Sequence, residues 1–168
     1  MDYEIRKAGF DDIDLLQGMM AEIMAGMNNS AHFVGSDQDY IINHIEQSGV
    51  TYLMTEAGRA MGFIAVDIPG EAEHNLGLDI DMAEADLNGV VHMDTIVVLP
   101  EFRGRGLQKA MLEYSEKQMK ISGYKDLMGT VHPDNIASLK SFISSGYVIE
   151  KTKIKYDGYL RHILRKKI

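Results

Sequence analysis

One segment constrains the fold of this chain more than any other: residues 97–108 read VVLPEFRGRGLQ. The β-branched residues favour a strand, the proline and glycines favour a tight turn, and the residues after Gly106 recur at helical spacing. The first turn of a helix leaves four N–H groups unpaired and carries a partial positive charge, so the expected ligand is a phosphate. Gly104 and Gly106 leave the backbone open to that phosphate, and Arg103 and Arg105 can add positive charge.

Hydrophobic periodicity predicts an α/β (α+β) domain, a mixed sheet covered on both faces by helices. The expected strands are 3–8, 50–56, 60–68, 89–99, 126–131, 147–156 and 159–168. The expected helices are 10–26, 37–48 with Ser36 as N-cap, 106–121, and one within 132–147 that Gly146 ends. The 106–121 helix is expected to place Leu107, Ala110, Met111, Tyr114, Gln118 and Ile121 on one stripe. Residues 68–89 are expected to be an excursion too polar for the core.

Composition limits the class of protein. A length of 168 residues predicts one domain, residues 1–168, and a net charge of −8 argues against nucleic acid and anionic membranes as partners. The absence of cysteine excludes disulfides, thiolate catalysis and cysteine-ligated zinc, and no metal is expected. Without an apolar run of membrane-span length or a signal peptide, a cytoplasmic location is expected. The basic residues at 161–167 are interpreted as a solvated edge strand.

Two known phosphate-binding loops do not fit the glycine turn. A Walker loop needs four residues between its glycines and a Lys-Ser/Thr pair after them. A dinucleotide fingerprint needs a third glycine, where this chain has Lys109. The turn by itself therefore indicates a phosphorylated ligand without identifying it.

A wider pattern is more specific. Val-Val-x-Pro and Arg-Gly-Arg-Gly-Leu are followed further along by His-Pro-x-Asn-x-x-Ser, and Ser-Gly-Tyr ends the next helix. Together with the N-terminal YEIRKAGFDDIDLL and the hairpin ending in MGFIAV, this pattern resembles the GNAT N-acetyltransferases over nearly the whole chain. The family motif Arg/Gln-x-x-Gly-x-Gly/Ala matches at Arg103 and Gly106 but departs at Gln108, which can either crowd a pyrophosphate or donate a hydrogen bond to it.

The resemblance implies a mostly antiparallel twisted sheet with a splayed central parallel pair. It also implies acetyl-CoA as cosubstrate and transfer of an acetyl group to a primary amine of a small molecule or peptide. The residues implied to bind the cofactor are Ile96, Val97, Val98, Arg103, Gly104, Arg105, Gly106, Leu107, Gln108, Lys109, Asn135, Ser138 and Phe142. Backbone N–H groups of 105–109 would hold the pyrophosphate, and the strand backbone near Ile96 and Val98 would pair with the pantetheine amides. A backbone N–H at about Val97 would polarise the thioester carbonyl.

Candidates for the acid–base chemistry lie on the same strand. His92 and Asp94 are two residues apart, so regular alternation predicts that they share one face with Ile96. Asp94 is preferred to His92 as the base, with a solvent-facing or paired carboxylate as the alternative. Phe142 stands where many family members have a tyrosine that protonates the departing thiolate, and Ser141 or Tyr147 are weaker substitutes. A thiol is a good enough leaving group for water to supply that proton.

Two other functions stay open at this point: a non-catalytic acyl-CoA-binding sensor and a nucleotide-binding regulator. The acetyl acceptor is not identified, although Asp79, Asp81, Glu84 and Asp86 would suit a cationic amine if they are more than a solvated acidic loop. A homodimer through the C-terminal hairpin or the Met-rich first helix is a further expectation.

Overall fold

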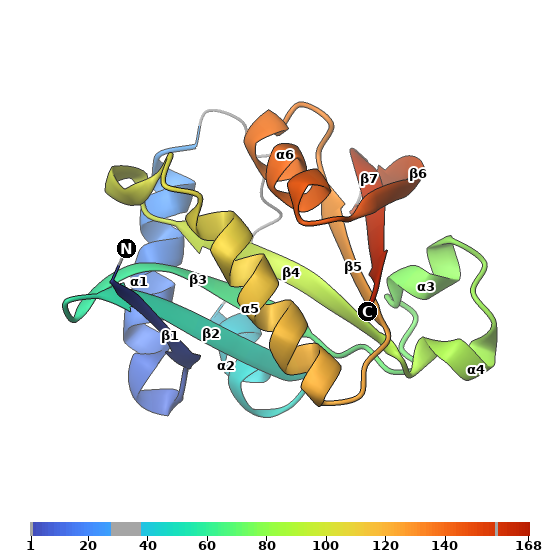
Figure 1. Ribbon diagram of the computed structural model, residues 1–168, viewed down its shortest axis with the longest axis horizontal. Coiled ribbons are helices and arrows are strands. Elements are labelled where there is room, and N and C mark those ends of the chain that lie inside the picture. Colours follow the sequence, from blue (N-terminus) through green and yellow to red (C-terminus); the bar gives the residue numbers. More distant parts are fainter. Residues whose placement is uncertain (1, 28–37, 157) are drawn as a thin grey trace.

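The computed structural model describes residues 2–27, 38–156 and 158–168. These residues form a seven-stranded sheet of order β1-β2-β3-β4-β5-β7-β6 with helices on both faces (Figure 1). The strands are β1 (Tyr3–Lys7), β2 (Gly49–Glu56), β3 (Arg59–Asp67), β4 (Val90–Val98), β5 (Asp126–Val131), β6 (Val148–Lys155) and β7 (Tyr159–Lys167). The helices are α1 (Ile13–Ala25), α2 (Gln38–Glu46), α3 (Leu76–Asp79), α4 (Glu84–Leu87), α5 (Leu107–Ile121) and α6 (Ile136–Ser144).

The sheet is antiparallel except where β4 meets β5. These two strands are parallel and pair only from Val90 to His92, opposite Asp126 to Met128. Beyond that point they diverge (Figure 1), so the C-terminal half of β4 has no partner on its β5 side. The predicted mixed sheet with a splayed parallel pair is confirmed.

Helices pack on both faces of this sheet. Figure 1 shows α5 crossing in front of β2, β3 and β4, with α1 and α2 behind the sheet and α6 beside α5. The apolar faces meet in a core in which Leu16 of α1, Phe63 of β3 and Met111 of α5 are fully buried. Burial of such side chains is the main force that holds these layers together.

Most predicted elements are confirmed within a few residues. The first helix opens with a 3-10 turn over Phe10–Asp12, and Gly123 and Gly146 have the left-handed φ angles of +89° and +88° expected just after a helix. The second helix begins at Gln38 in the described part of the chain, and its predicted N-cap, Ser36, lies outside the described residues.

Two expectations about the core are wrong. The 68–89 segment is not merely polar, because α3 and α4 form within it and bury Leu76 and Leu87. On α5, Ile121 is 72% exposed, while Leu112, Ser115 and Met119 are buried. The helix therefore turns a slightly different face to the sheet than the predicted stripe, and its last residue extends beyond the core.

The basic C-terminal strand is also not an edge strand. β7 lies between β5 and β6 in the sheet. Arg165 pairs with Asp126 at 2.7 Å, Lys166 pairs with Glu116 at 2.5 Å, and Arg161 is only 3% exposed. The interior strand thus brings Arg165 and Lys166 against acidic partners, and Arg161 against the rings of Tyr156 and Tyr159.

Candidate active site

The glycine turn has the geometry expected of a phosphate site. After a 3-10 turn over Pro100–Phe102, Gly104 and Gly106 adopt left-handed φ angles of +76° and +74°. A Cβ atom at either position would meet nothing within 4 Å, so both glycines face open space. In the described residues, no hydrogen-bond acceptor reaches the backbone N–H groups of residues 106–109. Four unpaired donors at the start of a 15-residue helix thus converge on that space.

The side chains of the turn interact with other parts of the protein rather than with this open space. Arg105 donates to Glu56 at 2.6 Å, and Arg103 Nε donates to the Val98 carbonyl at 3.3 Å. Lys109 lies 3.8 Å from Glu113, and Gln108 Nε2 donates to Ser138 Oγ at 2.9 Å. An anion in this turn would therefore meet backbone N–H groups first, and the Gln108 amide is held against α6.

A groove runs from this turn along the splayed edge of β4. Its volume is about 610 Å³, and its walls include Ile23 of α1, Gly106 and Ser141. A second cavity of about 310 Å³ continues from it between β4, β5 and α6. Ile96, Gln108 and Asn135 line both spaces.

The backbone of β4 presents alternate residues to this groove. Leu99 N–H donates to the Met61 carbonyl on β3 at 2.9 Å, and a Cβ at Gly62 would lie 2.4 Å from the Val97 carbonyl oxygen. The peptide groups of Val97 therefore face β3, so the expectation that the Val97 N–H contacts the thioester carbonyl at the open edge is wrong. Strand alternation directs those of Ile96 and Val98 toward the open edge, where pantetheine amides could pair with them.

A β-bulge places Asp94. Met93 pairs with Val66 and Thr95 pairs with Ala65, which leaves Asp94 as an extra residue without a partner on β3. His92 and Thr95 consequently share one face, because Asp67 and Ala65 do, and Ile96 lies on the other. The expectation that His92, Asp94 and Ile96 share a face is wrong, since the extra residue reverses the alternation.

Asp94 is exposed and lines the 310 Å³ cavity. Its Oδ2 accepts a short hydrogen bond from the phenol of Tyr40 on α2, and Tyr40 Oη lies 2.7 Å from Thr95 Oγ1. A phenol has one proton, so Tyr40 donates to Asp94 and Thr95 donates to Tyr40. Burial, together with the nearby Asp94 charge, raises the pKa of Tyr40 well above its ordinary value, which keeps the phenol protonated.

His92 lies outside both spaces. It is 4% exposed; its Nε2 accepts from Leu76 N–H at 3.0 Å, and its Nδ1 lies 3.1 Å from Asp67 Oδ2. Both ring nitrogens are engaged within the fold. The structure therefore separates His92 from Asp94, the other residue considered for proton transfer.

Helix α6 contributes the far wall. Asn135 caps it by accepting from Ser138 N–H at 3.2 Å, and Phe142 is 3% exposed, with its ring edge-to-face against Tyr147 at 4.9 Å. The Tyr147 hydroxyl is buried and does not line either space. Ser141 lines the groove but donates to the Ala137 carbonyl.

The cavity residues that were not among the sequence candidates include Tyr40, Tyr156 and Arg161. Tyr156 has a left-handed φ of +50°, and its hydroxyl lies 3.2 Å from Thr130 Oγ1. Burial raises the pKa of Tyr156 and lowers that of Arg161. No local motif marks these residues, because each reaches the cavity from an element distant in sequence.

The space fits an acylated coenzyme A. Unpaired N–H groups at one end suit a pyrophosphate, the open β4 edge suits two amides, and the cavity beyond holds a carboxylate where the acyl group would end. Fold and site together define an acetyl-CoA-dependent N-acetyltransferase. The chain belongs to the acetyltransferase (GNAT) family, which it matches over residues 19–147.

Similar proteins agree with this class. The chain is 22% identical to an aminoglycoside N(6')-acetyltransferase type 1 of Salmonella typhimurium, over 86% of this chain and 90% of the relative. Its fold resembles that of the ribosomal-protein-S18-alanine N-acetyltransferase of Escherichia coli, with a TM-score of 0.74, 16% identity, and coverage of 99% and 94% of the two chains. It also resembles an N-acetyltransferase from Thermoplasma acidophilum in complex with coenzyme A, with a TM-score of 0.70, 17% identity, and full coverage of both chains. None of the helices in the described ranges has the length and apolar character needed to cross a membrane.

Proposed function

We propose that this protein, acting as one domain, acetylates the primary amine of a small molecule or a peptide, and that Asp94 accepts the amine proton. The observation that carries this proposal is the placement of Asp94. Its carboxylate is turned into the cavity at the bulge of β4, is held there by Tyr40, and lies beyond the open strand edge.

The cofactor-binding part of the proposal rests on backbone groups. The N–H groups of residues 105–109 hold the pyrophosphate, with Gly104 and Gly106 allowing its close approach. Ile96 and Val98 pair with the pantetheine amides, and Arg103 adds charge at the mouth of the groove. Asn135, Ser138 and Gln108 form a polar wall on α6 and α5, and Phe142 provides an apolar surface for the thiol end.

The chemistry needs a neutral amine. Asp94 attracts the ammonium form and accepts its proton, directly or through one water, which frees the nitrogen lone pair to attack the thioester carbon. As the carbon–nitrogen bond forms and the carbon–sulfur bond breaks, the nitrogen releases its second proton to water. The thiolate takes a proton from water, since a thiol pKa of about 8.5 makes it a stable leaving group. Tyr40 is a positioning residue that fixes the carboxylate.

The acceptor class follows from the cavity wall. A carboxylate held by Tyr40 suits a cationic amine, and Arg161, a cation of the same wall, already lies over the Tyr156 ring. Asp79 is unsuited to steer such an amine, because Lys153 and Lys155 neutralise it. Relatives named for an aminoglycoside and for a ribosomal-protein alanine both act on amines.

A panel of amines, including aminoglycosides and peptides with N-terminal alanine, tests the proposal by release of free CoA thiol from acetyl-CoA. Asp94→Asn should lower kcat about 100- to 10,000-fold, the range of general-base catalysis, with CoA affinity unchanged. Asp86→Asn, at an exposed acidic residue of α4, is the matched control. Wild-type turnover in Asp94→Asn at neutral pH would remove Asp94 from the mechanism.

A further inference from the structure

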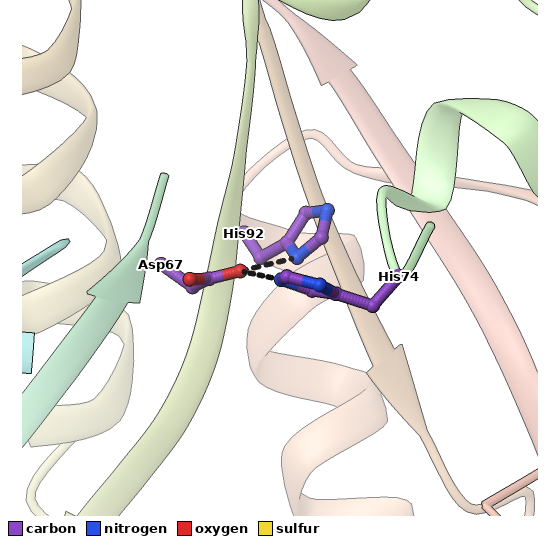
Figure 2. Close-up of side chains that lie close together, drawn as sticks. All are labelled: Asp67, His74 and His92. Carbon is purple, nitrogen blue, oxygen red and sulfur yellow. Dashed lines mark hydrogen bonds and ion pairs between the residues drawn. The ribbon is translucent and has the colours of Figure 1, made fainter. Parts of the chain in front are cut away.

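Behind the candidate active site, Asp67 at the end of β3 is surrounded by histidines from three other segments. His74 Nε2 lies 2.9 Å and His92 Nδ1 lies 3.1 Å from Asp67 Oδ2. Figure 2 shows both rings directed at this carboxylate. His44 of α2 approaches from the other side, with Nε2 at 3.7 Å from Asp67 Oδ1. The side chains of Asp67 and His44 are each 8% exposed, that of His92 is 4% exposed, and that of His74 is 63% exposed.

The hydrogen bonds of two histidines identify which nitrogens can bind a cation. Leu76 N–H donates to His92 Nε2 at 3.0 Å, so His92 carries its proton on Nδ1 and donates to Asp67. His92 is therefore a hydrogen-bond donor to the carboxylate rather than a metal ligand. Such donors commonly orient ligating groups from behind.

His44 has the opposite arrangement. Its Nδ1 lies 2.8 Å from the Tyr40 carbonyl, which can only accept, so Nδ1 carries a proton. The remaining nitrogen, Nε2, is buried without a hydrogen-bond partner and faces Asp67 at a distance too long for a hydrogen bond. A metal-binding histidine usually donates one ring N–H to a backbone carbonyl and coordinates through its other nitrogen, which is the arrangement that His44 offers.

The spacing suits a small divalent ion. Two ligand atoms about 2.1 Å from a zinc ion at the tetrahedral angle lie about 3.4 Å apart, close to the separation of His44 Nε2 and Asp67 Oδ1. The ligand atoms of Asp67, His74 and His92 all lie within 4.8 Å of one another. His44 is not in this group and approaches the other carboxylate oxygen, so His74 would have to turn toward His44 Nε2 to share an ion with it. His74 is exposed enough to turn its Nε2 to the ion while water satisfies its other nitrogen.

We propose that His44, Asp67 and His74 bind a first-row divalent transition metal, zinc by preference, with His92 orienting the carboxylate. Two imidazoles and one carboxylate favour such an ion over Mg²⁺ or Ca²⁺, which prefer oxygen ligands. This proposal departs from the expectation of no metal, because the fold brings together two histidines and a carboxylate. The ion would join α2, β3 and the segment before α3.

The proposed metal site also adjoins the acetyl-transfer site. His44 follows Tyr40 by one turn of α2, and their rings lie 4.1 Å apart. Because Tyr40 holds Asp94, a metal that fixes His44 would steady the helix that positions the carboxylate. The metal would act at a distance from the reacting atoms, since none of its ligands lines the acetyl cavity.

Direct metal binding tests this proposal without any activity assay. Chelator-treated protein is titrated with Zn²⁺ by calorimetry and with Co²⁺ by its visible absorption, which reports nitrogen and oxygen coordination. One equivalent should bind, Zn²⁺ should raise Tm, and Mg²⁺ should neither displace Co²⁺ nor raise Tm. His92→Asn should weaken binding about 10- to 100-fold, as expected of an outer-sphere partner.

His74→Ala is the decisive variant, because its exposed side chain can be removed without disturbing the core. His74→Ala and His44→Gln should each weaken Zn²⁺ binding by more than His92→Asn does. His162→Ala, which alters a histidine bonded to Thr152 outside the cluster, should bind like the wild type. No zinc binding at micromolar concentration, or equal affinity in His74→Ala and His162→Ala, would overturn the assignment.

Discussion

Replacing Gly106 by alanine should show that Gly106 matters more for phosphate binding than for the stability of the fold. Gly106 is the N-cap of α5 with φ +74°, and a Cβ there would meet no protein atom within 4 Å. The left-handed conformation costs an L-residue about 1–2 kcal/mol, and the stiffer unfolded chain returns about 0.4–1 kcal/mol. The net loss of about 1 kcal/mol should lower Tm by about 2–4 °C in a domain of this size.

The effect on coenzyme A binding should be larger. The new methyl group projects into the space where the pyrophosphate approaches the unpaired N–H groups, so at least one hydrogen bond to a charged oxygen is lost. Such a bond is worth about 1.5–3 kcal/mol, which corresponds to about a 10- to 150-fold rise in Kd. Calorimetric titration with CoA measures it, and pantetheine, which lacks the phosphates, should bind both proteins alike.

Gly123→Ala supplies the matched control at the opposite end of the same helix. Gly123 has φ +89°, and a Cβ there would likewise meet no protein atom within 4 Å, so the loss of Tm should be similar. Its CoA affinity should equal that of the wild type. If Gly106→Ala binds CoA as tightly as Gly123→Ala, the pyrophosphate does not rest on this turn.

Other predictions concern the catalytic carboxylate, the α6 wall and the acid stability of the fold. Tyr40→Phe should lower kcat while CoA affinity, measured by calorimetry, stays unchanged, because the phenol only positions Asp94. Gly129→Ala should lower the free energy of unfolding by about 1–3 kcal/mol in denaturant titrations, since its Cβ would lie 2.9 Å from the Phe142 ring. Burial raises the pKa of Asp79, but hydrogen bonds from Lys153 and Lys155 outweigh it and hold the pKa below its usual value. That stabilisation is present above the unfolded pKa of about 4 and is lost as pH falls through the lower folded pKa. Asp79→Asn should therefore flatten the loss of stability between about pH 4 and pH 2, and an unchanged acid denaturation profile would contradict the assignment.

Local chemistry explains why the sequence predicts the order of elements and the phosphate turn. Strand residues alternate or run apolar, glycines mark left-handed positions, and both signals act within a few residues. The contacts that complete the site are different. Tyr40 and Asp94 are 54 positions apart, and Asp67 meets His92 only because the register of β3 and β4 places them opposite each other. Buried polar contacts of this kind leave no periodic signal in the sequence.

The bulge on β4 is the clearest example of a feature that the sequence pattern does not predict. It also links the cofactor groove to the carboxylate proposed for proton transfer. Asp94 and Thr95 both line the cavity and both bond to Tyr40 of α2, which the alternating faces of a regular strand would not allow for adjacent residues. The extra residue also gives β4 the additional twist that a bulge produces. The last β4–β5 pair, His92 with Met128, lies just before it. The bulge thus lies where the parallel pairing ends, and the end of that pairing opens the groove for pantetheine. The bulge also places the Asp94 carboxylate at the end of that groove. Tyr40 then holds the carboxylate from α2, so cofactor binding and proton transfer depend on the same short stretch of strand.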